Sequence, residues 1–138
     1  MKFLLDNNLS PHLARGLAGL SGVDSARIES VVHLREKFAP NTRDAEWIQQ
    51  LAREGRWIVI SCDHFSKNDE EREALRVAGL IVFVLDRQWS SKNYWDQAHQ
   101  LVRWWPAIVN QADQLIGGAA FRVRWKVTNT KRFEQIRL

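Results

Sequence analysis

Short apolar runs that stop at an aspartate recur along this chain, and they constrain its fold more than any other feature. The runs span residues 2–5, 57–62 and 80–85, and they are followed directly by Asp6, Asp63 and Asp86. Runs of this length are short for helices, and their almost continuous apolar character is typical of strands buried on both faces. The sequence therefore predicts a parallel sheet.

Helix signals separate these predicted strands, as a parallel sheet requires. Ser10 followed by Pro11 is a typical helix start, and leucine and alanine residues follow at helical spacing. A second helix is expected over residues 41–52, with Asn41 as its cap, and a third over residues 66–77. Strands that alternate with helices in this way favour right-handed crossovers and a sheet covered on both faces.

The remaining segments complete the predicted order of elements. Residues 30–34 form another short apolar run, in which we interpret His33 as a strand histidine rather than a ligand. Residues 35–40 are expected to form a charged loop. A longer helix should follow the last of these strands, and Pro106 should kink or divide it. The expected fold is a single α/β domain whose central, mainly parallel sheet has about four strands flanked by helices.

The C-terminal segment has a different pattern. Within residues 121–127, apolar residues alternate with Arg122, Arg124 and Lys126. A period of two is typical of a strand, and here such a strand would have one apolar and one cationic face. We therefore predict an edge strand or an extended arm, whose cationic face could bind phosphate or an acidic partner.

Length and composition fit one domain. With 138 residues, 45% of them hydrophobic and 26% charged, the chain has an ordinary globular composition. Residues 1–118 are expected to form the α/β domain and residues 119–138 a strand or arm of that same domain. The single cysteine, Cys62, excludes an intrachain disulfide and a thiolate cluster. No stretch approaches the roughly 20 apolar residues of a membrane span, so we expect a cytoplasmic protein without membrane contact.

Carboxylates are predicted to gather at one edge of the sheet. The carboxyl ends of parallel strands share an edge where ligands bind, which should bring Asp6 and Asp63 together. The helix over residues 41–52 adds an acid near its start. Asp44 shares the apolar face of that helix, whereas Glu46 lies about 200° around it and should point toward solvent. The alternative for Asp44 is a capping interaction with Asn41.

Such a cluster, with no lysine or arginine expected among the carboxylates, would repel strongly at neutral pH. Mg²⁺ or Mn²⁺ would relieve the repulsion because both prefer oxygen ligands, and metal-bound water can attack a phosphodiester. We therefore predict that Asp6, Asp44 and Asp63 are catalytic residues and metal ligands. Further candidate metal ligands are Glu46, Asn7 and Asp86, and weaker candidates for substrate binding are Asn8, His64, Arg87 and Trp89.

Three motifs, in this order and spacing, resemble one known family. They are Leu-Leu-Asp-Asn-Asn-Leu-Ser-Pro at residues 4–11, Asp-Ala-Glu-Trp-Ile from residue 44, and Trp-Ile-Val-Ile-Ser-Cys-Asp at residues 57–63. They resemble the short PIN-like domains of the PIN ribonuclease superfamily, in particular the VapC-related toxin group. The resemblance implies endoribonuclease activity with Mg²⁺ or Mn²⁺, an RNA substrate and a cognate antitoxin protein. A fourth acid is usual in larger PIN domains but has no clear counterpart in this sequence, where Asp86 and Glu71 are weak candidates.

Two other functions fit parts of the pattern. If the acidic set is incomplete, the chain would be a non-catalytic PIN-like module that holds RNA or a protein partner. A phosphoacceptor receiver domain also places aspartates at strand ends. That domain would need an acid where Asn7 follows Asp6, and a lysine where Arg87 follows Asp86. The RNA target, the antitoxin and the oligomeric state, with a homodimer as one alternative, stay open at this point.

Overall fold

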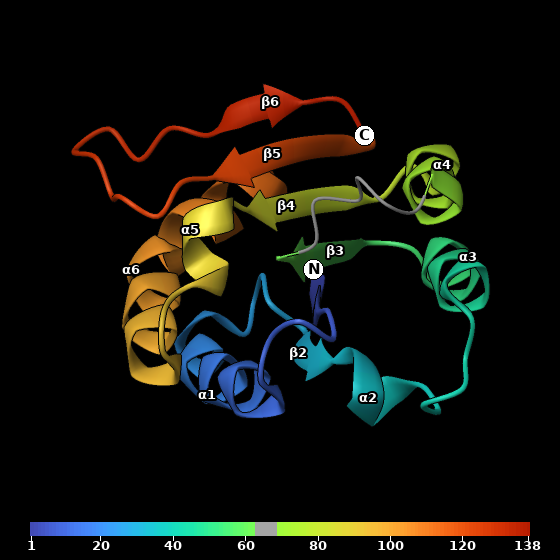
Figure 1. Ribbon diagram of the computed structural model, residues 1–138, viewed down its shortest axis with the longest axis horizontal. Coiled ribbons are helices and arrows are strands. Elements are labelled where there is room, and N and C mark those ends of the chain that lie inside the picture. The colour runs from blue at the N-terminus through green and yellow to red at the C-terminus, as the bar shows by residue number, and fades with distance from the viewer. Residues whose placement is uncertain (63–68) are drawn as a thin grey trace.

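The sheet has six strands within the described residues, and only the last of them runs antiparallel to its neighbour (Figure 1). The computed structural model describes residues 1–62 and 69–138. Across the sheet the order is β2-β1-β3-β4-β5-β6. The strands are β1 Lys2–Leu5, β2 Ser30–His33, β3 Trp57–Ser61, β4 Ile81–Leu85, β5 Ala119–Val123 and β6 Glu134–Ile136. The predicted mainly parallel α/β sheet is confirmed: β1 to β4 are the four expected strands, β5 is the predicted C-terminal strand, and β6 is one strand more.

Helices connect the parallel strands. They are α1 Pro11–Ser21, the 3₁₀ helix η1 Gly22–Asp24, α2 Leu34–Lys37, α3 Asp44–Glu54, α4 Asp69–Ala78, α5 Arg87–Ser90 and α6 Tyr94–Asp113. The predicted start of α1 is confirmed, because the Ser10 hydroxyl accepts a hydrogen bond of 3.1 Å from the backbone N–H of His12 and Pro11 begins the helix. None of the described helices is long and apolar enough to cross a membrane.

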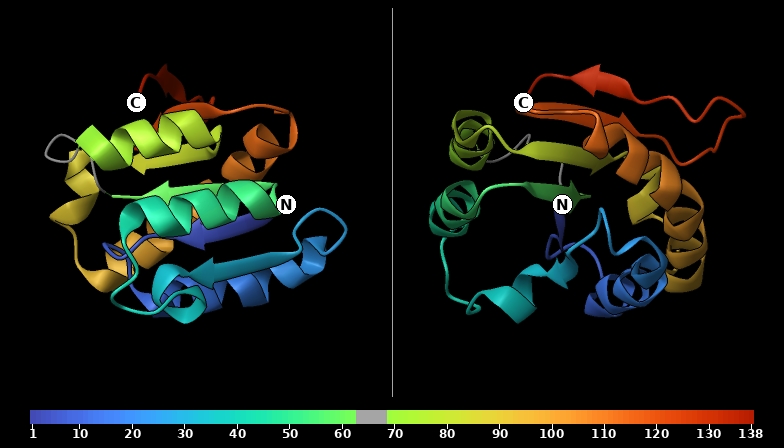
Figure 2. Two further views of the ribbon diagram at one scale, coloured as in Figure 1. Left: turned by 90° about the vertical axis from the view of Figure 1, so that its right-hand side faces the viewer. Right: turned by 180° about the vertical axis from the view of Figure 1, so that it is seen from behind.

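Helices cover both faces of the sheet (Figure 2), and the strands divide their apolar side chains between the two faces. Phe3 and Leu5 belong to the core cluster under α1 and α6. Leu4 and Val59 belong to the cluster under α3 and α4. Successive strand residues point to opposite faces, so residues two positions apart share a face. Asp6 should therefore point to the same side of the sheet as Leu4, the side covered by α3 and α4.

The strand predicted near residues 121–127, β5, lies inside the sheet rather than at its edge. β5 pairs parallel with β4 and antiparallel with β6, so the edge position predicted for residues 121–127 is wrong. The pattern of β5 could not reveal this, because β6 is a three-residue strand with a mostly polar sequence. Arg122 and Arg124 both donate to Glu134 of β6, at 2.9 and 3.1 Å, whereas Lys126 is exposed beyond the end of β5.

Two local predictions need correction. Residues 35–40 are not wholly a loop, because α2 follows β2 directly and extends to Lys37. Of the predicted kink or division at Pro106, the division is wrong, because α6 continues through the proline, and the kink stays a prediction. The proline ring removes the helical hydrogen bond to the carbonyl of Val102. Both residues lie on the exposed side of α6, where water can bind that carbonyl instead.

Candidate active site at the carboxyl ends of the strands

Asp6 is a buried acid with a fixed orientation. It follows β1 directly, its backbone N–H donates to the carbonyl of Ile60 at 3.0 Å, and it is only 6% exposed. One carboxylate oxygen, Oδ2, accepts a hydrogen bond of 3.0 Å from the Ser61 hydroxyl, and the other, Oδ1, accepts from the backbone N–H of Asn7 at 2.7 Å. The carboxylate is therefore held between β1 and β3, on the α3/α4 side that strand alternation predicts.

Ser61 is a residue of this site that the sequence analysis missed. It is completely buried at the last position of β3 and points to the same side of the sheet as Asp6. A usable signal was present in the sequence. Ser61 is the first polar residue after four apolar positions in β3, and it comes just before Cys62 and Asp63.

Asp44 is the second acid that the structure brings to this edge. It is the first residue of α3, it is half-buried, and its Oδ1 accepts a hydrogen bond of 3.0 Å from the indole N–H of Trp47. Glu46 is exposed and pairs with Arg43 at 3.2 Å. The predicted difference in direction between the two acids is confirmed. The capping role considered for Asn41 is wrong, because the N-cap position of α3 is occupied by Arg43.

Asn7 and Asp44 line one hollow of about 270 Å³ between the end of β1 and the start of α3. Arg35 lines the same hollow and donates from Nε to Oδ1 of Asn7 at 3.2 Å. A basic residue therefore lies in the same hollow as Asp44, and its described hydrogen bond is to the amide of Asn7. Asn7 presents its carbonyl oxygen to a guanidinium group, and Asn8 beside it is exposed in the same turn.

His33 fixes the segment that carries these asparagines. The imidazole is completely buried, and its Nδ1 accepts a hydrogen bond of 3.1 Å from the backbone N–H of Arg35. Nε2 must then carry the proton, and it donates to the carbonyl of Leu9 at 2.7 Å. His33 is thus a neutral histidine that ties the turn after β1 to β2, and its interpretation as a strand residue is confirmed.

A second acidic hollow lies on the other side of Asp44. Glu70 and Glu71, from the first turn of α4, line it together with Asp44. Glu71 is 6% exposed, whereas Glu70 is exposed. Of the two weak candidates for a fourth acid, Glu71 therefore lies near Asp44. Asp63 and His64 lie outside the described residues.

Asp86 stabilises the backbone around the end of β4. Its Oδ1 accepts from the backbone N–H of Gln88 at 3.0 Å, which caps α5, and its Oδ2 accepts from the backbone N–H of Trp125 at 3.1 Å. Trp89 is completely buried, and its indole N–H donates to the carbonyl of Val123 at 3.1 Å. The prediction that Trp89 contacts substrate is therefore wrong, whereas Arg87 is exposed beside Asp86.

Cys62 directly follows β3, the strand between β1 and β4, whose ends carry Asp6 and Asp86. Burial raises the pKa of its thiol to about 12, and the negative charges of Asp6 and Asp86 add to the shift. A thiol with this pKa stays protonated at neutral pH, so Cys62 is a core residue and not a nucleophile.

We expect Cys62 to resist alkylation by iodoacetamide in the folded protein at pH 8, and to react rapidly once urea unfolds the chain.

The raised pKa of the Cys62 thiol also predicts that the free energy of unfolding falls at high pH. The pKa of the thiol is about 12 in the folded protein and about 9 in the unfolded chain. Between these pH values the thiol ionises only in the unfolded chain, so the contribution of Cys62 to the free energy of unfolding is present below pH 9 and falls as the pH rises toward 12. Urea titrations of wild type and Cys62→Ala should therefore diverge above pH 9, and parallel pH profiles would contradict the assignment.

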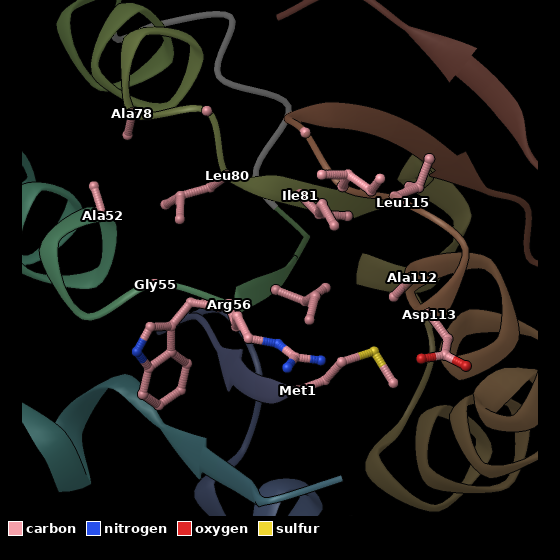
Figure 3. Close-up of a pocket in the computed structure, with 15 residues that line it drawn as sticks. Met1, Ala52, Gly55, Arg56, Ala78, Leu80, Ile81, Ala112, Asp113 and Leu115 are labelled. Atoms are coloured by element: carbon pink, nitrogen blue, oxygen red, sulfur yellow. The ribbon is translucent and has the colours of Figure 1, made fainter. Parts of the chain in front are cut away.

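A separate cavity of about 170 Å³ lies at the opposite, amino-terminal edge of the sheet (Figure 3). Arg56 and Asp113 bring opposite charges to its wall. Arg56 has a φ of 62°, which is uncommon for a residue other than glycine. Because ligands of parallel α/β sheets bind at the carboxyl ends of the strands, we do not assign this cavity to the acidic site.

These features define a class of protein, namely an α/β domain with buried and half-buried carboxylates at the carboxyl ends of its parallel strands. A family model described as a PIN-like domain matches residues 1–87, a range that includes Asp6, Asp44 and the position of Asp63. The chain therefore belongs to the PIN-like domain family, which is part of a superfamily of nuclease type. No solved structure matches the chain.

Proposed function

We propose that this PIN-like protein is a metal-dependent endoribonuclease whose catalytic acids are Asp6, Asp44 and Asp63. The observation that carries the proposal is the position of Asp6, a buried carboxylate held between two strand ends by the Ser61 hydroxyl. An oriented carboxylate at the carboxyl ends of parallel strands is the kind of ligand that Mg²⁺ and Mn²⁺ prefer. Asp44 lies on the same side of the sheet. The family to which the chain belongs is part of a superfamily of nuclease type, which supports the same proposal.

The described donors suit Mg²⁺ or Mn²⁺ in their chemistry, because carboxylate and amide oxygens are the ligands that these ions prefer. Within residues 1–62 and 69–138, no three acidic, histidine or cysteine side chains lie close enough together to hold an ion. A complete ligand set would therefore depend on Asp63. When bound, the cation would supply an activated water and stabilise charge on the phosphate. The Ser61 hydroxyl and the backbone N–H of Asn7 would hold the Asp6 carboxylate in place.

The same geometry supports a second candidate function. Asp86 uses both of its carboxylate oxygens for backbone hydrogen bonds, so it is poorly suited to complete an acidic set. Without a further acid, the chain would be a non-catalytic PIN-like module that binds RNA or a protein. Metal binding separates this alternative from the nuclease.

The test is a calorimetric titration of the protein with Mn²⁺, combined with cleavage of an RNA labelled at both ends. We expect Mn²⁺ binding and internal cleavage in Mg²⁺ or Mn²⁺, and no cleavage in EDTA. RNA binding without Mn²⁺ binding or cleavage would contradict the nuclease proposal and favour the non-catalytic module.

We further propose that the protein is the toxin of a toxin–antitoxin pair that acts in the cytoplasm. The support is the resemblance of the motifs around Asp6, Asp44 and Asp63 to the VapC-related group. Induced expression should arrest growth, and co-expression with the adjacent open reading frame should relieve the arrest. Growth arrest by an Asp6→Asn variant would contradict a toxic effect through RNA cleavage.

A further inference from the structure

An arginine-lined groove of about 500 Å³ lies next to the acidic edge, on the side of the sheet that α4 covers. Five arginines from separate parts of the chain line this arginine groove, namely Arg72, Arg87, Arg122, Arg124 and Arg137. Arg72 belongs to α4 and Arg87 to α5, while the other three lie in or next to β5 and β6. Only the fold brings them together, because they do not form a basic run in the sequence.

The carboxylates of the groove do not balance these charges. Arg122 and Arg124 share one oxygen, Oε2, of Glu134. Asp86 lies at the end of the groove, but backbone N–H groups occupy both of its oxygens. Five arginines and two carboxylate side chains therefore lie in or beside the groove, and Arg72 donates to the backbone carbonyl of Arg137 at 3.3 Å. The excess positive charge suits an anion with several charges.

The groove has a rigid frame at the end nearest the acidic edge. Asp86 joins the start of α5 to the segment after β5 through its bond to the N–H of Trp125. The ring of Trp125 packs edge-on against the buried Trp89, with ring centroids 4.9 Å apart. Arg87 and Arg124 each adjoin one of these fixed residues. Little backbone ordering would be needed for them to bind a ligand, which favours affinity.

The position of the groove connects it to the acidic edge. β4 ends at Asp86, β1 ends at Asp6, and only β3 lies between them. Two strand spacings place these ends roughly 10 Å apart. This separation is short enough for one extended polyanion to contact both the groove and Asp6.

We infer that the arginine groove binds the sugar-phosphate backbone of single-stranded RNA beside the bond to be cleaved, an inference that rests on the proposed ribonuclease function. Guanidinium groups bind phosphate through paired, parallel hydrogen bonds, so arginine suits this ligand better than lysine does. Asp86, at the end of β4, lines the groove, so the groove adjoins the acidic edge of the sheet on its β4 side.

The first test measures binding without cleavage, by fluorescence anisotropy of a short labelled RNA in EDTA over a range of salt concentrations. We compare wild type with R87Q/R124Q, whose exposed side chains can be replaced without disturbing the core. The variant should bind at least about tenfold more weakly at low salt. Each lost phosphate contact lowers the salt slope by about 0.7, so the slope should fall by roughly 1.4. The matched control R53Q/R103Q removes two exposed helix arginines outside the groove and should bind like wild type.

A second variant should change the affinity for RNA in the opposite direction. Glu134→Gln removes the carboxylate that engages Arg122 and Arg124. Both guanidinium groups would then be free to bind phosphate, and RNA should bind about two- to fivefold more tightly, the range expected for an exposed ion pair. Glu134 lies on the exposed edge strand, so the fold should be unaffected.

The outcomes for the groove and for the nuclease are distinguishable. If R87Q/R124Q binds RNA as wild type does, the groove inference is overturned even if the protein cleaves RNA. If wild type binds RNA and the variant does not, the groove stands even if no metal supports cleavage. A labelled polyglutamate peptide that binds in place of RNA would overturn the inference and identify an acidic protein as the ligand.

Discussion

Asp6→Asn should reduce metal-dependent RNA cleavage by at least about a hundredfold while the protein stays folded. Asparagine has the same shape as aspartate and can still accept the hydrogen bond from Ser61, but it lacks the charge that would bind a cation. A bound metal contributes several kcal/mol to stabilisation of the transition state, and each 1.36 kcal/mol is a factor of ten in rate. The measurement is the initial cleavage rate in Mn²⁺, together with calorimetric Mn²⁺ binding. Asp63→Asn should behave in the same way.

The Ser61 hydroxyl, which donates a hydrogen bond to Asp6, provides a control with a smaller expected effect. Ser61→Ala keeps the carboxylate of Asp6 and removes one of its hydrogen bonds, so cleavage should fall by about tenfold, as expected for a group that only orients a ligand.

The thermal unfolding midpoint of Asp6→Asn should match or exceed that of wild type without metal, because repulsion between carboxylates falls. Wild-type cleavage rates in folded Asp6→Asn would remove Asp6 from the catalytic set.

The parts of this protein that could be predicted from its sequence are those set by local patterns. Apolar runs located β1, β3 and β4, and the aspartate after β1 was correctly placed at the sheet edge because parallel strands end together. Helical periodicity separated Asp44 from Glu46, since the apolar face of α3 is marked by Trp47 and its neighbours. In these cases the periodicity alone determines the direction of the side chain.

The parts that could not be predicted depend on contacts between distant residues. Trp89 follows a strand in the sequence like a loop residue, yet it is buried because Trp125 and the carbonyl of Val123, more than thirty positions later, surround it. Asp86 has the same sequence setting as Asp6, but its oxygens are engaged by Gln88 and Trp125. A strand pattern shows that an acid lies at the edge, and only the tertiary neighbours determine what it binds.

The arginine groove has the same origin. Its residues come from α4, α5 and the C-terminal strands, and each arginine alone reads as an ordinary surface charge. The sequence did suggest a cationic face on β5, but it placed the strand at the edge and included Lys126. The structure puts β6 outside β5, and Glu134 of that strand binds two of the arginines.

The second large effect expected concerns the two acids in the first turn of α3. Asp44→Asn should reduce cleavage by about a hundredfold, because it removes a charge that faces the hollow shared with Asn7 and adjoins Glu71. Glu46→Gln should leave cleavage within about twofold of wild type. Glu46 is exposed, and its ion pair with Arg43 is of the kind that contributes about 0–1 kcal/mol.

The pair is a matched comparison, because each variant removes one negative charge from the first turn of the same helix. Any effect on the helix dipole should therefore be similar in both, and urea titrations should show similar free energies of unfolding. The two acids differ in the direction of the side chain and in its partners, Trp47 for Asp44 and Arg43 for Glu46. With stability measured for both variants, the ratio of the two cleavage rates reports which acid acts at the site. A larger loss in Glu46→Gln would show that the acid facing solvent is the catalytic one, and that α3 must rotate or shift before RNA is cleaved.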